Sequence, residues 1–411
     1  MSSEYQRSLP YEWTVQTVME SSKLIMDYRG RTPRKLGMEW GGGRIPALSA
    51  RNVRMGQIDF SEECHLASET LYQRWMTSGD MQRGDILITT EAPLGNIAAV
   101  PDERKYILSQ RTVLLRPNTD LFDPLYFLKF LQSSFFQRSL SDNATGSTAL
   151  GIQRKRLEKL LVLRPPMLEQ RRIGLALEDT DQLINATKGL IAKKQAIKHG
   201  MVHELVSGRT RLGGFSGSWK TARFRDLASP VKERFTPSAD CSSLEVVELE
   251  HLAQGTGQLV GTSLLGKSAS LKTRFREGDV LFGKLRAYLR KFWLADRDGF
   301  CSTEIWALRV NPRNAVGAFV RYLVESEGFI EVASVAYGTH MPRSDWRLVG
   351  GYRIQLPEVD EQTAIAAVLT DADADIRVLQ QRADKAREIR QGMMQELLTG
   401  RTRLVPREVS A

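Results

Sequence analysis

The amino-acid sequence predicts an α+β fold in which two duplicated α/β domains are separated by two long antiparallel helices that form a coiled coil. Three observations favour this fold class: a long internal repeat, two β-rich blocks and two helical segments with a heptad pattern. In the clearest repeat, residues 198–212 (KHGMVHELVSGRTRL) recur at 390–404 (RQGMMQELLTGRTRL), with nine of fifteen positions identical at an offset of 192. Tandem duplication of this kind usually indicates pseudo-twofold symmetry.

Each half of the chain begins with a β-rich block, at residues 10–163 and 215–356. Short β-branched runs such as 85–90 and 279–282 are punctuated by glycine and proline, the pattern of short strands joined by turns. Within each block one stretch instead carries apolar residues at helical spacing. These stretches are residues 124–138 and 315–335. We therefore expect a mixed α/β domain in each half.

A long helix is expected after each block, from about Leu168 to Val206 and from about Glu361 to Leu398. A proline precedes each helix and a glycine follows it, as at many helix boundaries. Their apolar positions alternate at spacings of four and three, the period of a coiled-coil seam. The seam positions are Ile173, Leu177, Thr180, Ile184, Thr187 and Ile191, and then Ile365, Leu369, Ala372, Ile376, Leu379, Ala383 and Ala386. Because each connection crosses a whole domain, the helices should pack antiparallel.

Two kinds of residue are expected to pair the helices. The first kind is apolar and buried between them, namely Ile184, Ile191, Ile376 and Leu379. The second is glycine at Gly200 and Gly392, where glycine costs about 1 kcal/mol relative to alanine and predicts a close backbone approach. The expected division of the chain is a domain at 1–164, a helix at 165–208, a domain at 209–357, and a helix with its tail at 358–411.

Composition narrows the class of protein. A chain of 411 residues, 42% of them apolar, fits two or three folded domains. A net charge of +10 favours a polyanionic partner such as nucleic acid. The three cysteines, Cys64, Cys241 and Cys301, are scattered, which argues against a disulfide framework or a zinc site. The sequence has neither a membrane-length apolar run nor a signal-peptide core, so we expect a cytoplasmic protein with no membrane partner.

Shorter motifs recur in the same order in both halves. The first half contains DYRGRTP (27–33), GDILITTEAPLGN (84–96), LSQRT (108–112), GST (146–148) and PPMLEQRRI (165–173), and the second half contains GDVLFGKLRAY (278–288), CSTE (301–304), GTH (338–340) and PEVDEQ (357–362). No single motif is decisive, but their order, present twice, is. Over essentially its whole length the chain resembles the specificity (S) subunit of type I restriction-modification systems.

The resemblance implies a function as well as an architecture. The two β-rich domains would be target recognition domains in inverted orientation, each reading one half of a bipartite sequence in double-stranded DNA. The helices would set the spacer and dock two methyltransferase (M) subunits, and restriction (R) subunits would join the full complex. S-adenosylmethionine, ATP and magnesium would belong to those partners, so this chain would bind no cofactor and hold no catalytic residue. The specificity subunit of another modification complex is an alternative.

A competing hypothesis from another class is a P-loop nucleotide hydrolase that uses Gly261–Ser268. This segment, GTSLLGKS, matches the phosphate-binding pattern GxxxxGK[ST]. The pattern requires a buried strand before it and a helix after it, whereas residues 254–260 are turn-like and residues 268–278 carry little helical signal. His199 and His203 have the four-residue spacing of helical metal ligands but lack the glutamate of a zinc-protease helix, so no metal site is expected.

Candidate DNA-binding residues come from two basic clusters and two loops. Lysine and arginine pair with phosphates, and arginine also reads guanine edges. The first cluster is Arg29, Arg31, Arg34 and Lys35, and the second is Lys284, Arg286, Tyr288, Arg290 and Lys291. The loop candidates are Ser147, Thr148, Thr339 and His340, which could contact phosphate through backbone N–H groups. Solvated charged surfaces and plain turns would produce the same patterns.

Overall fold

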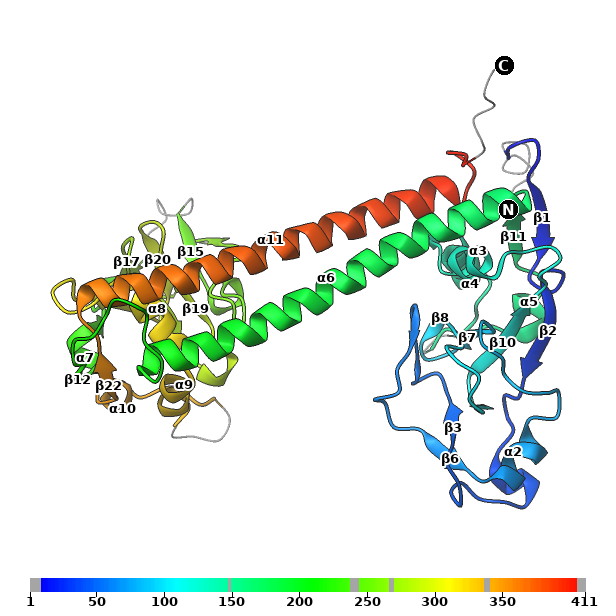
Figure 1. The fold of residues 1–411 in the computed structure, drawn as a ribbon, viewed down its shortest axis with the longest axis horizontal. Helices are drawn as coiled ribbons and strands as arrows, with labels where there is room; N and C mark the ends of the chain where they lie inside the picture. Colours follow the sequence, from blue (N-terminus) through cyan, green and yellow to red (C-terminus); the bar gives the residue numbers. More distant parts are fainter. Residues whose placement is uncertain (1–8, 147–148, 237–243, 266–269, 336–340, 405–411) are drawn as a thin grey trace. The chain divides into compact units, whose positions relative to one another are not determined.

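The computed structural model describes residues 9–146, 149–236, 244–265, 270–335 and 341–404. The chain forms two compact units, unit 1 (1–187 with 382–411) and unit 2 (188–381). Two long helices, α6 (Met167–Ser207) and α11 (Val359–Leu397), contribute to both units (Figure 1). Their bounds confirm the two long helices that the sequence predicts.

Unit 1 is built on a four-stranded antiparallel sheet in the order β2-β10-β7-β8. Its strands are β2 (Ser22–Asp27), β7 (Ile86–Thr90), β8 (Leu94–Ala99) and β10 (Thr112–Pro117), and α3 (Pro124–Leu131) and α4 (Ser134–Asp142) contact β8. The smaller elements are β1 (Thr14–Thr17), η1 (Pro33–Leu36), β3 (Ile45–Leu48), β4 (Val53–Arg54), β5 (Gln57–Ile58), β6 (His65–Ala67), α2 (Glu69–Trp75), β9 (Ile107–Leu108), α5 (Arg154–Leu157) and β11 (Leu161–Arg164). The core joins the sheet and α3–α4 to the ends of both long helices.

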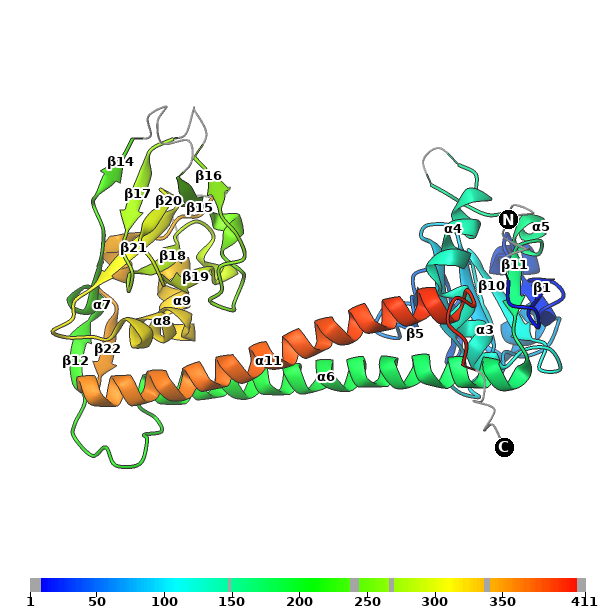
Figure 2. The ribbon, with the colours of Figure 1, turned by 90° about the horizontal axis from the view of Figure 1, so that it is seen from above.

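Unit 2 repeats this plan with a four-stranded sheet in the order β13-β21-β18-β19. The equivalent elements are β12 (Lys220–Arg223), β13 (Ala228–Pro230), β18 (Val280–Gly283), β19 (Phe292–Leu294), β21 (Ile305–Val310), α8 (Gly317–Glu325), α9 (Glu327–Ser334), α10 (Trp346–Val349) and β22 (Arg353–Leu356). The others are α7 (Phe224–Leu227), β14 (Arg234–Phe235), β15 (Glu245–Val247), η3 (Leu249–His251), β16 (Ser263–Leu264), β17 (Lys272–Phe275), η4 (Ala287–Leu289) and β20 (Gly299–Ser302). A second, five-stranded sheet (β14-β17-β20-β15-β16) lies at the end of unit 2 away from α11 (Figure 2).

The duplication extends to individual buried contacts. In unit 1, Asp85 is 2% exposed and accepts hydrogen bonds from Arg116 Nε (2.8 Å) and Nη2 (2.7 Å). In unit 2, Asp279 is 3% exposed and accepts the same pair from Arg309, at 2.9 and 2.8 Å. A buried carboxylate needs such a partner, because desolvation otherwise disfavours its charge. Both halves therefore use the same internal supports for their sheets.

A buried glutamine fixes the start of each long helix. The side-chain amide of Gln170 accepts from the backbone N–H of Asp123 and donates to the carbonyls of Leu121 and Pro165. Gln362 makes the equivalent three bonds to the backbone of Val316, Asn314 and Pro357. These bonds hold α6 against the N-terminus of α3, and α11 against that of α8.

The helices pair antiparallel in each unit, as the sequence predicts. In unit 1, Thr180 donates to Met393 Sδ and Asp181 pairs with Arg390. In unit 2, Lys194 pairs with Asp375 and Lys198 pairs with Asp373. The residue numbers of successive partners therefore increase along α6 and decrease along α11. Of the predicted seam residues, Ile184 and Ile376 are buried, whereas Ile191 and Leu379 are half-buried.

The prediction for the two mid-helix glycines is wrong. A Cβ atom built at Gly200 or Gly392 meets nothing within 4 Å, so neither marks a close backbone approach. Each lies two residues beyond a cation that faces the partner helix, Lys198 or Arg390. At 3.6 residues per turn, two residues rotate the side-chain direction by about 200°. Both glycines therefore face away from the seam.

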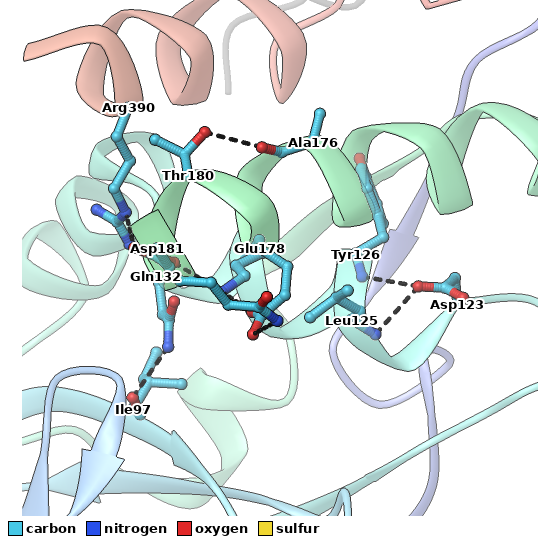
Figure 3. Close-up of polar contacts among 12 residues, drawn as sticks. Ile97, Asp123, Leu125, Tyr126, Gln132, Ala176, Glu178, Thr180, Asp181 and Arg390 are labelled. Carbon is cyan, nitrogen blue, oxygen red and sulfur yellow. Dashed lines mark hydrogen bonds and ion pairs between the residues drawn. The ribbon is translucent and has the colours of Figure 1, made fainter. Parts of the chain in front are cut away.

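A cluster of opposite charges links three helices in each unit. In unit 1, Lys129 of α3 lies 2.7 Å from Asp181 and 2.8 Å from Glu178. Arg390 of α11 also pairs with Asp181 (Figure 3). The equivalent group in unit 2 brings Arg321 of α8 and Lys198 of α6 onto Asp373 of α11. In unit 1 the shared aspartate lies on α6 and pairs with a cation of α11, whereas in unit 2 the aspartate lies on α11 and pairs with a cation of α6. This exchange is expected for a duplicated chain.

The start of each long helix also carries a buried glutamate. Glu361 is 3% exposed and accepts from Arg211 (2.9 and 2.6 Å) and Trp219 Nε1 (2.8 Å). Glu169 is bound in the same way by Arg403 and Trp13. Burial raises the pKa of Glu361, but the hydrogen bonds from Arg211 and Trp219 outweigh it and lower the pKa.

This lowered pKa makes a prediction for Glu361→Gln. A carboxyl group whose pKa is lower in the folded state stabilises the protein above its unfolded pKa, and the contribution is lost as pH falls through the folded pKa. We expect the free energy of unfolding of the variant to be lower than that of wild type by about 2 kcal/mol at neutral pH. This difference in stability should narrow below about pH 4.5. Urea unfolding of both proteins across this pH range measures the difference in stability. A difference that widened on acidification would contradict the lowered pKa of Glu361.

Candidate nucleic-acid interface

Three segments meet beside the sheet of unit 1: the β7–β8 hairpin turn, the turn before β10 and residues 149–153. The backbone N–H of Thr90 donates to the carbonyl of Arg111 (2.8 Å), and the N–H of Ile152 donates to the carbonyl of Thr90 (3.0 Å). Glu91 forms a β-bridge with Gly151. The motifs at 84–96 and 108–112 thus come together with residues 149–153, which follow the motif at 146–148 in the sequence.

The same three segments meet in unit 2. The N–H of Lys284 donates to the carbonyl of Glu304 (3.0 Å), and the N–H of Ser344 donates to the carbonyl of Lys284 (2.9 Å). Leu285 forms a β-bridge with Arg343, whose guanidinium hydrogen bonds lower the pKa of the Glu304 carboxyl. The recurring motifs of both halves therefore build one recurring structure, which we call the loop junction.

Each loop junction contains strained backbone. Ala92 has φ +44° and Arg286 has φ +54°, at equivalent places in the two hairpins. A left-handed conformation costs a residue with a side chain about 1–2 kcal/mol, and such strain is concentrated at functional sites. In unit 2, Arg290 (φ +50°) closes the turn, Ala287 is buried within it and Tyr288 is 53% exposed. The strained turn consequently presents Arg286 and Tyr288 to solvent.

The first predicted basic cluster divides into two pairs. Arg29 binds both carboxylate oxygens of Asp27 and donates to the carbonyl of Ile152 (2.9 Å), which ties its loop to the junction. Arg31 donates to the carbonyl of Trp75. Arg34 and Lys35 are exposed; Lys35 donates to the carbonyl of Gly30, and within the described part of the chain the Arg34 side chain has no partner. The second pair remains accessible to a phosphate.

The second cluster divides in a similar way. Arg290 pairs with Glu327, and Lys291 Nζ donates to the carbonyl of Leu249 (2.6 Å). The half-buried Lys284 contributes its backbone to the junction. Only Arg286 and Tyr288 of this cluster are exposed. The loop candidates Ser147, Thr148, Thr339 and His340 lie outside the described residues.

A third basic cluster is not among the candidates that the sequence predicts. Arg154, Lys155 and Arg156 of α5 and the following Lys159 are all exposed, directly after residues 149–153 of the loop junction. A four-residue helix leaves no periodic signal, although the density of basic residues in QRKRLEK (153–159) could have indicated it. A hollow of about 360 Å³ lies beside this helix at the unit 1 junction. It is lined by Arg29, Thr90, Glu91, Thr145, Ala149, Gly151, Ile152, Gln153 and Arg154.

The structure disfavours the P-loop hypothesis. Ser263 and Leu264, in the middle of Gly261–Ser268, form strand β16, which pairs with β15. Among the described residues, the next regular element after the motif is strand β17, not the helix that a P-loop needs to hold phosphate. Residues 266–268 of the motif lie outside the described residues.

The described residues also offer no metal site. They hold no group of three or more His, Cys, Asp or Glu side chains placed to bind a metal ion. His199 approaches Glu327 at 3.3 Å, and His203 contacts Arg209 instead of pairing with His199. Across the described ranges, no helix is both long and apolar enough to cross a membrane.

Comparison with known proteins agrees with this arrangement. Residues 25–196 match the family model described as the type I restriction modification DNA specificity domain. The type I restriction enzyme MjaVIII specificity subunit of Methanocaldococcus jannaschii is 21% identical over 96% of this chain and 94% of its own length.

Two solved structures share the fold. One, from work on complex assembly and conformational transition of the type I R-M system, has a TM-score of 0.60 at 17% identity and covers 96% of this chain and 100% of that chain. The other, a type I restriction-modification S subunit from M. genitalium, has a TM-score of 0.59 at 12% identity and covers 95% and 96%. The fold and loop junctions define a duplicated scaffold of two similar units. Residues 25–196 match the type I restriction modification DNA specificity domain, and the chain is similar over nearly its whole length to a type I restriction enzyme specificity subunit.

Proposed function

We propose that this chain is the DNA sequence-recognition subunit of a type I restriction-modification complex, with one half of a bipartite target read by each unit. The observation that carries this function is the recurrence of the loop junction, built from the same motifs in both units. Two copies of one recognition structure suit a target of two parts. The net charge of +10 supports binding to a polyanion.

Recognition is assigned to the exposed residues of the two junctions. Arg34 and Lys35 contact phosphate, while Arg286 and Tyr288 reach into a groove from the strained turn. Arg29, Arg31, Arg290 and Lys291 act on DNA through the loops that they hold in place. Backbone N–H groups at Ser147, Thr148, Thr339 and His340 add phosphate contacts. The recognition domains are residues 1–164 and 209–357.

The helices at 165–208 and 358–411 give the chain its role in assembly. Their antiparallel pairing supports a pseudo-twofold arrangement, with the two recognition domains in inverted orientation and separated by a coiled coil. We infer that they dock two methyltransferase subunits and set the spacer between half-sites. Restriction subunits join the full complex, which acts on DNA in the cytoplasm. Because those partners bring S-adenosylmethionine, ATP and magnesium, this chain itself catalyses nothing.

Reconstitution tests the proposed function. The purified chain, its cognate methyltransferase subunit and S-adenosylmethionine should together produce N6-methyladenine at a split target. Neither protein alone should do so. Methylation of the same sites by the methyltransferase subunit without this chain would contradict the proposal, as would ATP hydrolysis by this chain that Lys267→Ala abolishes. Activation of a methyltransferase that has no restriction partner would instead favour the specificity subunit of another modification complex.

Arg286 provides a more local prediction. Asparagine tolerates the left-handed backbone, so Arg286→Asn removes the charge with little backbone penalty, and Arg286→Lys keeps the charge. If Arg286 meets a phosphate, the asparagine variant should bind target DNA more weakly, and its slope of log affinity against log salt should be shallower by about 0.9. The lysine variant should keep the wild-type slope. Identical slopes for all three proteins would remove Arg286 from the phosphate contacts.

A further inference from the structure

A basic groove lies on unit 1 beside the loop junction. It has a volume of about 840 Å³ and runs between α4, the α5–β11 segment and the last turns of α11. Four basic side chains line it, from Arg138, Arg156, Lys159 and Arg401, against a single carboxylate from Asp142. Buried Ser133, Leu160 and Met394 form part of its lining. The groove is therefore a formed depression with a strong excess of positive charge.

Little of this charge is neutralised within the protein. Across the described residues, the side chains of Arg138 and Lys159 have no hydrogen-bond or ion-pair partner. Arg401 forms a long ion pair with Glu396, at 3.9 Å. Arg156 uses one nitrogen to donate to the carbonyl of Asn143 (3.2 Å). Cations left unpaired along one groove favour an anionic partner that supplies several charges.

The groove is continuous with the candidate DNA interface. Asn143 lines the groove and begins the segment that enters the loop junction. Helix α5 contributes Arg154 to the hollow at the junction and Arg156 to the groove. A partner bound at the junction could therefore extend into the groove along the same loop and helix α5.

Three of the four groove charges do not recur in unit 2, whereas Arg401 recurs as Arg209. Aligning Ser133 with Ser326, the residues before α4 and α9, places Glu331 opposite Arg138. At the offset of 192, Leu348 replaces Arg156 and Gly351 replaces Lys159. A protein partner docked equivalently on both units should meet the same residues twice. The difference instead fits DNA, whose contacts in each unit can vary with the half-site that it reads.

We propose that this groove binds the phosphate backbone of duplex DNA flanking the half-site read by unit 1. The proposal rests on the proposed function of the chain. DNA carries one phosphate per 3.4 Å of each strand, so successive phosphates can meet cations spread along a groove. Contacts of this kind add affinity and position the duplex without reading its sequence.

The test uses the complex assembled with the methyltransferase subunits. One variant combines Arg138→Gln, Lys159→Gln and Arg401→Gln, and its matched control, Arg138→Lys, Lys159→Arg and Arg401→Lys, keeps every charge. Binding is measured over a range of salt to a target duplex with long flanks, and to one trimmed to the half-site on the side of unit 1. Exchanging the second recognition block identifies that side, because the half-site that does not change belongs to unit 1.

On the long duplex, the glutamine variant should bind at least about tenfold more weakly, with a salt slope shallower by about 2 to 3. The control should match wild type, and all three proteins should bind the trimmed duplex alike and methylate the same sequence. Wild-type affinity and slope in the glutamine variant would overturn the proposal. So would failure of that variant to assemble with its partners, which would assign the groove to an acidic protein segment. Absence of target-specific binding by the wild-type complex would instead contradict the proposed function.

Discussion

Lengthening both long helices by one turn is expected to change the DNA target that the complex methylates. Four residues add about 6 Å to a helix at 1.5 Å per residue, close to two base pairs at 3.4 Å each. The lengthened complex should therefore methylate a target whose two half-site sequences are unchanged and whose spacer is about two base pairs longer. It should lose activity on the original target.

The structure indicates where the insertions belong. Placed after Thr187 in α6 and after Gln381 in α11, they fall at the boundary between the units along each helix. Each charge cluster, at Asp181 and at Asp373, then keeps its partners within its own unit. Insertion into α6 alone is the control, and it should disrupt the pairing of the helices. Methylation of the original target by the doubly lengthened protein would show that the helices do not set the spacer.

A large loss of folding stability is expected from Asp373→Ala. Asp373 lies 2.8 Å from Lys198 and 2.9 Å from Arg321, and the side chains of both cations are less than 10% exposed. The variant leaves these cations with Glu325 as their remaining carboxylate in the cluster. Removing one partner from a buried ion pair typically costs about 3–5 kcal/mol.

Urea unfolding of Asp373→Ala beside Asp375→Ala measures this effect. Asp375 pairs with Lys194 on the same two helices, but its side chain is 64% exposed. Exposed pairs contribute about 0–1 kcal/mol, so the control should unfold almost like wild type. Equal losses in the two variants would mean that burial does not determine the strength of the cluster.

The sequence was most informative where structure repeats along one element. The apolar period and the flanking proline and glycine predicted α6 and α11 to within a few residues. The seam buries Ile184 and Ile376 as expected. Glycine carries no comparable directional signal. Gly200 and Gly392 were conspicuous because the repeat retains both, but periodicity alone did not show that they face away from the seam.

The candidate interface was harder to predict because its partners are distant in sequence. The motifs indicated which segments matter, but a run of basic residues does not reveal which side chains turn inward. Arg29 meets Ile152, and Arg290 meets Glu327. These contacts depend on how the loops pack at the junction. The left-handed turn that exposes Tyr288 also has no sequence signal, since the residues that adopt it are arginines rather than glycines.

Exchanging one recognition block would show whether each unit reads one half of the target. Residues 215–356 would be replaced by the equivalent block of a relative with a different target, and methylated adenines would be mapped across a genome by single-molecule sequencing. We expect a new sequence in one half-site, with the other half-site unchanged. A change in both half-sites, or in neither, would contradict this expectation.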